Sequence, residues 1–291
     1  MSARAPVGFV YVNGHVVPAA GARVSVFDRG FLYGDGLFET MRSYRGALFG
    51  LSEHLARLRA SARWLRIPVP SIDWSRAIER LLRRNDLLDG DAAVRITLTR
   101  GPGRPGLLPP AAVTPTVLIV ATMIGLEVAR AQRRGARVTL LPFARAGATA
   151  GHKTLDYVPA ILGRMQAQRV NAFEALYVTP RGHVTEGTTS NLFVVRRGAL
   201  LTPPLDSTAG VLPGVTRRLV MDLARTLTLR VRECRVPVRE LLAAEEAFCT
   251  SSVVEIVPIV RVDNRPIADG RCGALTRQLQ LGYRARVGRA S

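Results

Sequence analysis

The sequence is almost without lysine. Of its 41 basic residues, Lys153 is the single lysine and all the others are arginines. An arginine guanidinium effectively never loses its proton, whereas a buried lysine amine can lose it and then condense with a carbonyl group. Residue 153 is therefore a position where amine chemistry is required, unless a base composition that favours arginine codons has left one stray surface lysine. The count alone does not choose between these two interpretations.

Cysteine and long apolar runs are also scarce. The three cysteines, Cys234, Cys249 and Cys272, are far apart, contain no CxxC pair and leave one thiol over in any disulfide scheme. This pattern favours a reducing, cytoplasmic location. The most apolar segment, 113–126, is interrupted by Thr, Pro and Gly, so the sequence predicts no membrane span and no membrane partner.

Acidic residues are few, 22 against 41 basic ones, and the formal net charge is +19. Such an excess attracts nucleic acids when it is focused on one face. Here the arginines occur singly or in pairs, with no run of five and no zinc-finger spacing. We therefore expect no specific nucleic-acid binding, only weak binding at low salt, and no metal site.

The first part of the chain, residues 1–128, reads as a small mixed α/β domain. Asn13-Gly14 predicts a tight hairpin between strands at 9–12 and 15–17. The glycine-rich segment 28–36 predicts a shaped loop without regular structure. Further along we expect a second hairpin (37–44 and 47–49), a helix capped by Ser52 and ended by Pro68, a helix from Trp74 to about Gly90, and strands at 92–99 and 116–124 around the loop 100–106.

Residues 129–135 are polar and are expected to link this domain to a larger one over 136–291. In the larger domain the patterns predict several strands and helices. The strands are expected near 137–142, 174–179, 190–195, 199–202 and 247–249, and the helices at 158–170, 214–228 and 273–283. Pro159 and Pro213-Gly214 mark the starts of two of these helices.

A catalytic lysine that forms an imine usually serves pyridoxal phosphate, which also needs an acid for its pyridine nitrogen and donors for its phosphate. Glu186, in the run Val184–Asn191, offers the acid, although a solvated hairpin tip explains it equally. The segment Leu212–Thr216 opens a predicted helix, where free N–H groups suit a phosphate and where Thr216 could instead be a plain cap.

Three other sites are weaker candidates. Thr250–Ser252 could add hydroxyl donors or form a polar turn, and Arg57 on the first amphipathic helix could bind an anion. His152, beside the lysine, is expected to serve packing or hydrogen bonding rather than to act as a second base.

The order of the motifs is more specific than any one of them. YGDGLFE, EHLARL, the lone lysine, VTEGTTSNLF, LPGVTR and TSSVVEIVPI follow one another from about Phe9 to Leu281. In this order they resemble the fold-type IV pyridoxal-phosphate enzymes, the class IV aminotransferases. The resemblance implies an α+β, two-domain fold, with a small N-terminal α/β domain and a larger C-terminal domain that has a β-barrel-like core.

The resemblance also implies the cofactor and the site residues. Lys153 would form the internal aldimine and move the proton, and Glu186 would pair with the pyridine nitrogen. Leu212 would lie against the ring, and Tyr157 would contact the ring oxygen, although its spacing from the lysine is one residue shorter than in the family. The phosphate would be held by Arg57, Val215, Thr216 and Ser252, with Ser251 nearby.

The substrate is less clear from the sequence. Tyr33, Phe38 and Glu39 would line the substrate pocket, and Arg42, Arg95 and Arg104 are candidates to bind the substrate carboxylate. Asp28-Arg-Gly and Thr99-Arg-Gly resemble D-amino-acid enzymes, and Phe38–Arg42 resembles branched-chain enzymes. No subgroup matches fully.

These features predict an aminotransferase that moves an amino group between an amino acid, of the D or the branched-chain type, and a 2-oxo acid. The alternative is an aminodeoxychorismate lyase, which the Arg100–Gly106 loop also resembles. In the family a loop of one subunit commonly completes its neighbour's pocket, so a homodimer is expected.

Overall fold

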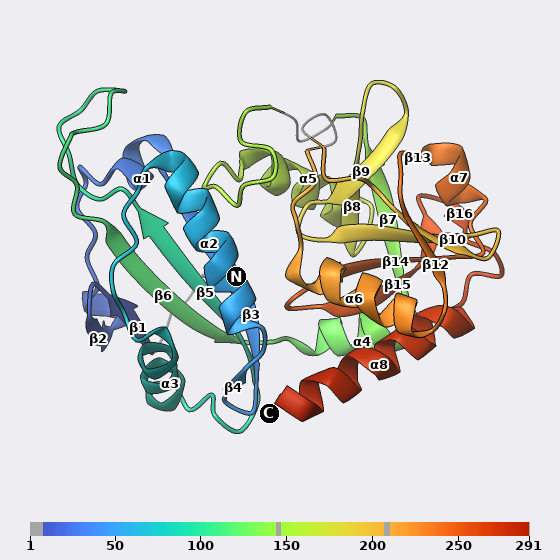
Figure 1. The fold of residues 1–291 in the computed structure, drawn as a ribbon, viewed down its shortest axis with the longest axis horizontal. Coiled ribbons are helices and arrows are strands. Elements are labelled where there is room, and N and C mark those ends of the chain that lie inside the picture. The colour runs from blue at the N-terminus through green and yellow to red at the C-terminus, as the bar shows by residue number, and fades with distance from the viewer. Residues whose placement is uncertain (1–7, 144–146, 207–209, 291) are drawn as a thin grey trace. The chain divides into compact units, whose positions relative to one another are not determined.

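The computed structural model describes residues 8–143, 147–206 and 210–290, and the chain forms two compact units. The first unit contains the chain up to Ile124, and the second begins at Gly125. The short segment His152–Asp156 belongs to the first unit, although the chain on both sides of it belongs to the second (Figure 1). The lysine is therefore part of the first unit.

The first unit is built on an antiparallel sheet with the strand order β2-β1-β6-β5-β3-β4. Both predicted hairpins are confirmed, and Asn13 and Gly14 take the left-handed φ values of 46° and 100° that their tight turn requires. The strands are β1 (Phe9–Val12), β2 (His15–Pro18), β3 (Gly36–Tyr44), β4 (Ala47–Leu48), β5 (Asp91–Thr99) and β6 (Thr116–Met123).

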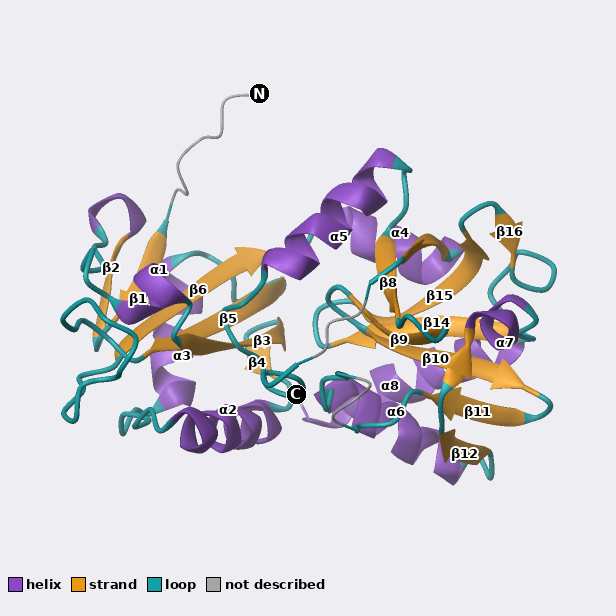
Figure 2. Cartoon of the chain, turned by 90° about the horizontal axis from the view of Figure 1, so that it is seen from above, coloured by secondary structure: helices purple, strands orange, loops and turns teal. Residues whose placement is uncertain are grey.

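Two helices, α2 (Leu51–Leu65) and α3 (Trp74–Arg84), bury their apolar stripes against this sheet, and Figure 2 shows both on the same side of it. Both helices were predicted, but the expected cap was wrong. Gly50, in a left-handed conformation after β4, precedes α2, so Ser52 lies inside the first turn, where its hydroxyl donates to Glu53.

The expectation that residues 28–36 lack regular structure was also wrong. A short helix, α1 (Arg29–Tyr33), forms there and ends at Gly34, whose φ is 67°. Asp28 caps it by accepting the N–H of Gly30, and the hydroxyls of Thr99 and Thr116 hold the same buried carboxylate. Those two threonines are far from the segment in sequence. The prediction of a loop used only the glycine content of residues 28–36 and therefore missed the contacts that hold the cap. A 3-10 turn, Ala19–Gly21, precedes this region.

The second unit contains a closed sheet in which β10, β14, β15, β7, β8 and β9 pair in a ring. The pair Glu186–Asn191 between β9 and β10 closes it. The predicted α+β class with a barrel-like core is confirmed. The ring strands are β7 (Ala136–Leu141), β8 (Glu174–Val178), β9 (His183–Gly187), β10 (Asn191–Arg196), β14 (Glu246–Ser251) and β15 (Glu255–Val262). The flanking strands are β11 (Ala199–Thr202), β12 (Arg230–Glu233), β13 (Val236–Pro237) and β16 (Arg265–Pro266).

Helices surround this ring in the second unit (Figure 2). They are α4 (Leu126–Arg134), α5 (Val158–Arg169), α6 (Val215–Thr226), α7 (Val238–Leu242) and α8 (Ala274–Ala290). The residues expected to link the domains lie mostly in α4. Helix α8 extends beyond its predicted end, and its first turn is held by the Glu246 carboxylate, which accepts the N–H groups of Leu275 and Thr276.

A buried carboxylate fixes the turn between β9 and β10. Glu174, on β8, accepts the hydroxyls of Thr188, Thr189 and Ser190 at 2.5, 2.9 and 3.0 Å, together with two backbone N–H groups of the same turn. A carboxylate can only accept, so it matches this cluster of donors. Over the residues that the structure describes, none of the helices combines the length and the apolar character that a membrane span needs.

Candidate active site

The segment that carries Lys153 pairs with the beginning of β3. The N–H of Phe38 donates to the carbonyl of Lys153 at 2.9 Å, and the N–H of Leu155 donates to the carbonyl of Gly36 at 3.1 Å. A side chain at Gly36 would place its Cβ 2.7 Å from the Leu98 carbonyl oxygen. Glycine is therefore required where the lysine segment meets the sheet.

His152 secures the same segment to α2. Its ring stacks on the indole of Trp64 with centroids 4.1 Å apart and planes 10° apart, and Nδ1 lies 3.1 Å from the Ser61 hydroxyl. Partial burial lowers the pKa of His152. These contacts agree with the expected packing role.

The lysine amine lies over the ring of Phe38, with Nζ 4.5 Å from the ring centre. The guanidinium carbon of Arg95 lies 3.7 Å from the centre of the same ring, and its Nε contacts Thr97. Both are cation–π distances. Among the predicted residues, the structure thus brings together Lys153, Phe38 and Arg95.

The other two arginine candidates make different contacts. Arg42 donates to Asp91 at 2.5 Å and lies over the Tyr44 ring. Arg104 is exposed on the loop between β5 and β6. Tyr33 also belongs to that region, where its hydroxyl accepts the N–H of Gly106 at 2.8 Å.

Glu39 was expected beside Phe38 in the substrate pocket, but it lies on the opposite face of β3 from Phe38. Successive side chains on a strand point to opposite faces, so Glu39 shares with Leu37 and Met41 the face of β3 that α2 covers. There Glu39 is fully buried and accepts hydrogen bonds from Arg57 and His54. The motifs contained Glu39 and His54, but only the three-dimensional structure reveals their pairing.

In the second unit Glu186 is 4% exposed on β9, so the alternative of a solvated hairpin tip is excluded. Its carboxylate accepts the N–H of Leu212 at 2.8 Å and the side-chain amide of Asn191 at 3.3 Å. Asn191 also donates to the Leu212 carbonyl at 2.9 Å, and a Cβ at Gly214 would lie 2.0 Å from its Oδ1. Asn191, which was not among the predicted site residues, therefore connects Glu186 to the segment before α6.

The beginning of α6 suits an anion. Its cap residue is Gly214, which makes no side-chain cap, and Thr216 does not cap the helix either. The first-turn N–H groups at Val215 and Thr216 have no partners within a helix, and the helix dipole favours negative charge there. Thr250 pairs with Asn191 in the ring, and its buried hydroxyl has no hydrogen-bond partner among the described residues.

The strand β14 ends with the predicted hydroxyl-rich segment. Ser251 is its last residue, and its Oγ accepts the Val254 N–H at 3.4 Å. Ser252 begins the turn that follows. A buried carboxylate, uncapped helix N–H groups and neighbouring hydroxyls form a donor and acceptor set that fits pyridoxal phosphate.

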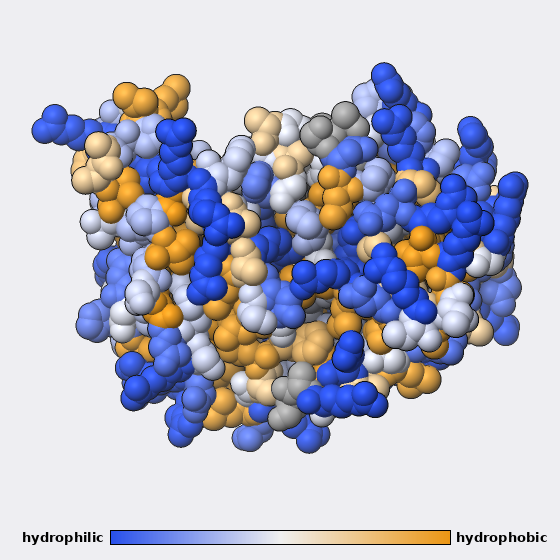
Figure 3. All heavy atoms as spheres, in the orientation of Figure 1, coloured by the Kyte–Doolittle hydropathy of each residue, from blue (hydrophilic) through white to orange (hydrophobic). Residues whose placement is uncertain are grey.

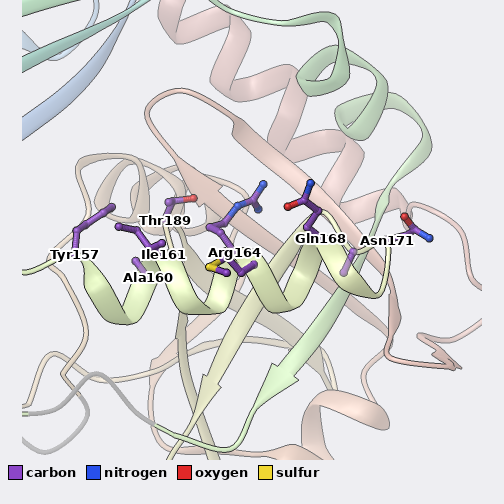
Figure 4. Close-up of a pocket in the computed structure, with 9 residues that line it drawn as sticks. Tyr157, Ala160, Ile161, Arg164, Gln168, Asn171 and Thr189 are labelled. Carbon is purple, nitrogen blue, oxygen red and sulfur yellow. The ribbon is translucent and has the colours of Figure 1, made fainter. Parts of the chain in front are cut away.

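Tyr157 lies at the beginning of α5 and lines a pocket of about 600 Å³ on the second unit. Figure 4 shows Tyr157, Ile161 and Arg164 along α5, with Thr189 beside them. Thr189 comes from the turn that Glu174 holds, so this pocket adjoins the β9–β10 motif. Its walls also include Met165, Gln168 and Asn171.

Comparison with known proteins identifies the family. A sequence profile described as "Amino-transferase class IV" matches residues 36–262. A Methanocaldococcus jannaschii protein assigned as a branched-chain-amino-acid aminotransferase is 35% identical, over 94% of this chain and 95% of that protein. The aminodeoxychorismate lyase of Bacillus subtilis is 32% identical, over 96% and 94%.

A solved structure agrees with these sequence matches. The branched-chain amino acid aminotransferase of Escherichia coli superposes with a TM-score of 0.89 at 30% identity, over 96% of this chain and 94% of that one. The chain therefore belongs to the class IV aminotransferases, a family of pyridoxal-phosphate-dependent enzymes.

Proposed function

We propose that this protein transfers an amino group between an amino acid of the branched-chain type and a 2-oxo acid, with pyridoxal phosphate bound at Lys153. The observation that carries the proposal is the single lysine of the chain, held by backbone pairing with its amine over Phe38 and with Arg95 on the same ring. The branched-chain relatives in sequence and in structure support the substrate class.

Each group of residues is assigned to one part of the cofactor. Glu186 would hold the pyridine nitrogen in its protonated form, with Leu212 against the ring and Tyr157 at the ring oxygen. The first-turn N–H groups of Val215 and Thr216, with Ser251, Ser252 and Arg57, would hold the phosphate. Pyridoxal phosphate, when bound, supplies an aldehyde that condenses with amines and a ring that accepts electrons from the substrate Cα.

The residues of the chain then have separate tasks. Lys153 would hold the cofactor through its Nζ and would carry the proton that leaves the substrate Cα. Glu186 is buried and accepts from a backbone N–H and an amide, and both bonds stabilise its charged form. That charge would hold the pyridine nitrogen of the bound cofactor in its protonated form.

Arg95 is proposed to bind the substrate carboxylate. It lies on the same Phe38 ring as the lysine amine, whereas Arg42 is paired with Asp91. A planar guanidinium can bind a carboxylate through two parallel hydrogen bonds. This placement favours a substrate whose amine and carboxylate meet Lys153 and Arg95 together.

A second candidate function is aminodeoxychorismate lyase activity, which releases pyruvate and 4-aminobenzoate. The 32% identity to the Bacillus subtilis lyase over nearly the whole chain supports it. The two reactions need the same lysine and the same acid, so the residues described here serve either one.

The first unit exposes a set of large apolar side chains, which we call the α1 patch: Val26, Phe27, Phe31, Leu107 and Leu108. They range from 54% to 89% exposed, and Figure 3 shows apolar side chains at the tip of the loop between β5 and β6. The buried Arg29 guanidinium donates to the carbonyls of Gly106 and Leu107, which fixes this loop to α1. Contiguous apolar patches of this kind mark interaction sites.

We assign the α1 patch to contact with a second copy of the chain, in a homodimer. The three cysteines are unpaired, which supports a cytoplasmic location for this assembly.

Replacing Lys153 tests the amine chemistry. Lys153→Arg keeps the positive charge but cannot condense with an aldehyde, so we expect turnover to fall to background. In the wild-type protein, borohydride should fix the cofactor to the peptide that contains residue 153. Substantial turnover by the variant, or a fixed cofactor on another peptide, would refute the assignment.

Replacing Glu186 tests the electron-sink role. Glu186→Gln should retain much of the cofactor, because the amide still fills the buried site, but should lose most of kcat, because the pyridine nitrogen is no longer held protonated. Cofactor content by absorbance and kcat are measured on the same preparation. An unchanged kcat with reduced cofactor content would contradict the role.

Replacing Arg95 tests substrate binding. Arg95→Ala should raise KM for L-leucine roughly 10- to 100-fold, since a hydrogen bond to a charged group is worth about 1.5–3 kcal/mol. Arg83→Ala, on an exposed helix face, is the control and should leave KM unchanged. The same assays are repeated with D-amino acids. If D-amino acids are the substrates, Arg104→Ala should raise their KM.

A panel that adds aminodeoxychorismate separates the two candidate functions. If the protein releases pyruvate and 4-aminobenzoate but forms no keto acid from leucine, the lyase is its function and the proposed aminotransferase activity is refuted.

The α1 patch predicts the oligomeric state. The wild-type protein should sediment at no less than twice its 31.6 kDa, and a Leu107→Asp, Leu108→Asp variant should shift towards the monomer because it places charge in the apolar contact. The control is Met123→Asp, an exposed apolar position of β6 outside the patch. A fully active wild-type monomer would refute the dimer.

A further inference from the structure

The first unit contains a cluster of three side chains in which Glu39 and His54 are buried and have no task in the proposed function, while Arg57 is the proposed phosphate ligand. Glu39 on β3 accepts from Nε of Arg57 at 2.8 Å and from its Nη2 at 2.7 Å. His54, one turn before Arg57 on α2, contributes Nδ1 at 2.7 Å from the same carboxylate. Since a carboxylate only accepts, the Nδ1 of His54 carries the proton in that bond.

The carboxylate at the centre of this group keeps its charge. Burial acts to raise the pKa of Glu39, but the hydrogen bonds from Arg57 and His54 and the charge of Arg57 outweigh it and lower the pKa to about 2. Burial also lowers the pKa of His54, which favours the neutral ring. Glu39 therefore remains a fixed negative charge at every pH at which such an enzyme operates.

Contact through two atoms fixes the orientation of a guanidinium. The group is planar, and the edge formed by Nε and Nη2 faces Glu39, so the Nη1 edge points away from the carboxylate. A long arginine side chain held at one point only would sample several rotamers, and the second hydrogen bond removes that freedom.

We propose that Glu39 is a positioning residue, which aims the Arg57 guanidinium at the phosphate of the cofactor. The inference rests on the proposed function, in which Arg57 is one of the phosphate ligands. Through this pair the specificity for a phosphorylated cofactor depends on a buried carboxylate that does not itself contact the cofactor.

A second buried ion pair in the same unit provides a matched control. Asp35 accepts from Arg100 Nε at 2.7 Å and Nη2 at 3.1 Å, and its pKa is also lowered despite partial burial. Arg100 in addition donates to the carbonyls of Leu65 and Arg66. This pair resembles the Glu39–Arg57 pair in geometry, but its arginine holds the end of α2.

The experiment compares pyridoxal phosphate with pyridoxal, which lacks the phosphate. The dissociation constants of both compounds are measured on cofactor-free protein by absorbance titration. The dissociation constant of pyridoxal divided by that of pyridoxal phosphate reports how much the phosphate contributes to binding. Glu39→Gln should reduce this ratio roughly 10- to 100-fold, by analogy with the removal of groups that orient metal-ligating side chains. Asp35→Asn should leave the ratio unchanged, even if it lowers Tm as much as Glu39→Gln does.

Three further variants make the test complete. Arg57→Ala should reduce the ratio at least as much as Glu39→Gln, and the double variant should be no worse than Arg57→Ala, because Glu39 acts through Arg57. Glu39→Asp keeps the charge but is one methylene shorter, so it should reduce the ratio without loss of folding. It replaces Glu39→Gln if that variant does not fold.

The outcomes separate this inference from the proposed function. Equal weakening of both ligands by Glu39→Gln, or an additive double variant, would show that Glu39 is only structural and would overturn the inference. An unchanged ratio in Arg57→Ala would overturn it as well. Failure of the wild-type protein to bind either ligand at Lys153 would instead remove the proposed function.

Discussion

The backbone pairing between the lysine segment and β3 is the interaction on which the candidate site depends. Because the N–H of Phe38 donates to the carbonyl of Lys153, the strand that fixes the lysine also fixes the ring beneath its amine. Strand β5 then places Arg95 by its register with β3, in which Thr40 lies opposite Arg95. The opposite face of β3 carries Glu39 towards α2 and thereby holds Arg57. One strand therefore sets the positions of the lysine amine, of the Phe38 ring and of two guanidinium groups.

Acidic residues have a particular role in a chain with so many arginines. Glu174, Glu186 and Glu246 are each held in the second unit by backbone N–H groups, which fix a turn, the segment before α6 and the beginning of α8. In the first unit Asp28 accepts a backbone N–H and fixes the start of α1, whereas Glu39 accepts from the side chain of Arg57 and fixes that side chain. A carboxylate accepts several hydrogen bonds at once, so one buried acid organises a loop that would otherwise have unsatisfied donors.

Much of this organisation could be predicted from the sequence. Periodicity and turn signals located most strands and helices, and the order of motifs identified the family. Local patterns did not reveal α1, because its cap is held by Thr99 and Thr116. They did not reveal the burial of Glu186 either, because closure of the ring depends on pairing between strands. The partners of Glu39 were missed for the same reason. Contacts between residues far apart in sequence have no local signature.

The position of the lysine segment has a consequence for engineering. Residues 152–156 pack in the first unit, yet the chain enters and leaves them from the second unit. The two units are therefore not exchangeable modules, and a chimera joined near Ile124 would combine the lysine of one parent with the β3 of the other. A functional hybrid must exchange Gly36, Phe38 and residues 152–156 as one set, because their fit at the close approach of Gly36 is shared. The lysine segment and the start of β3 are distant in sequence but paired in the fold, and recombination at the boundary between the units would take them from different parents.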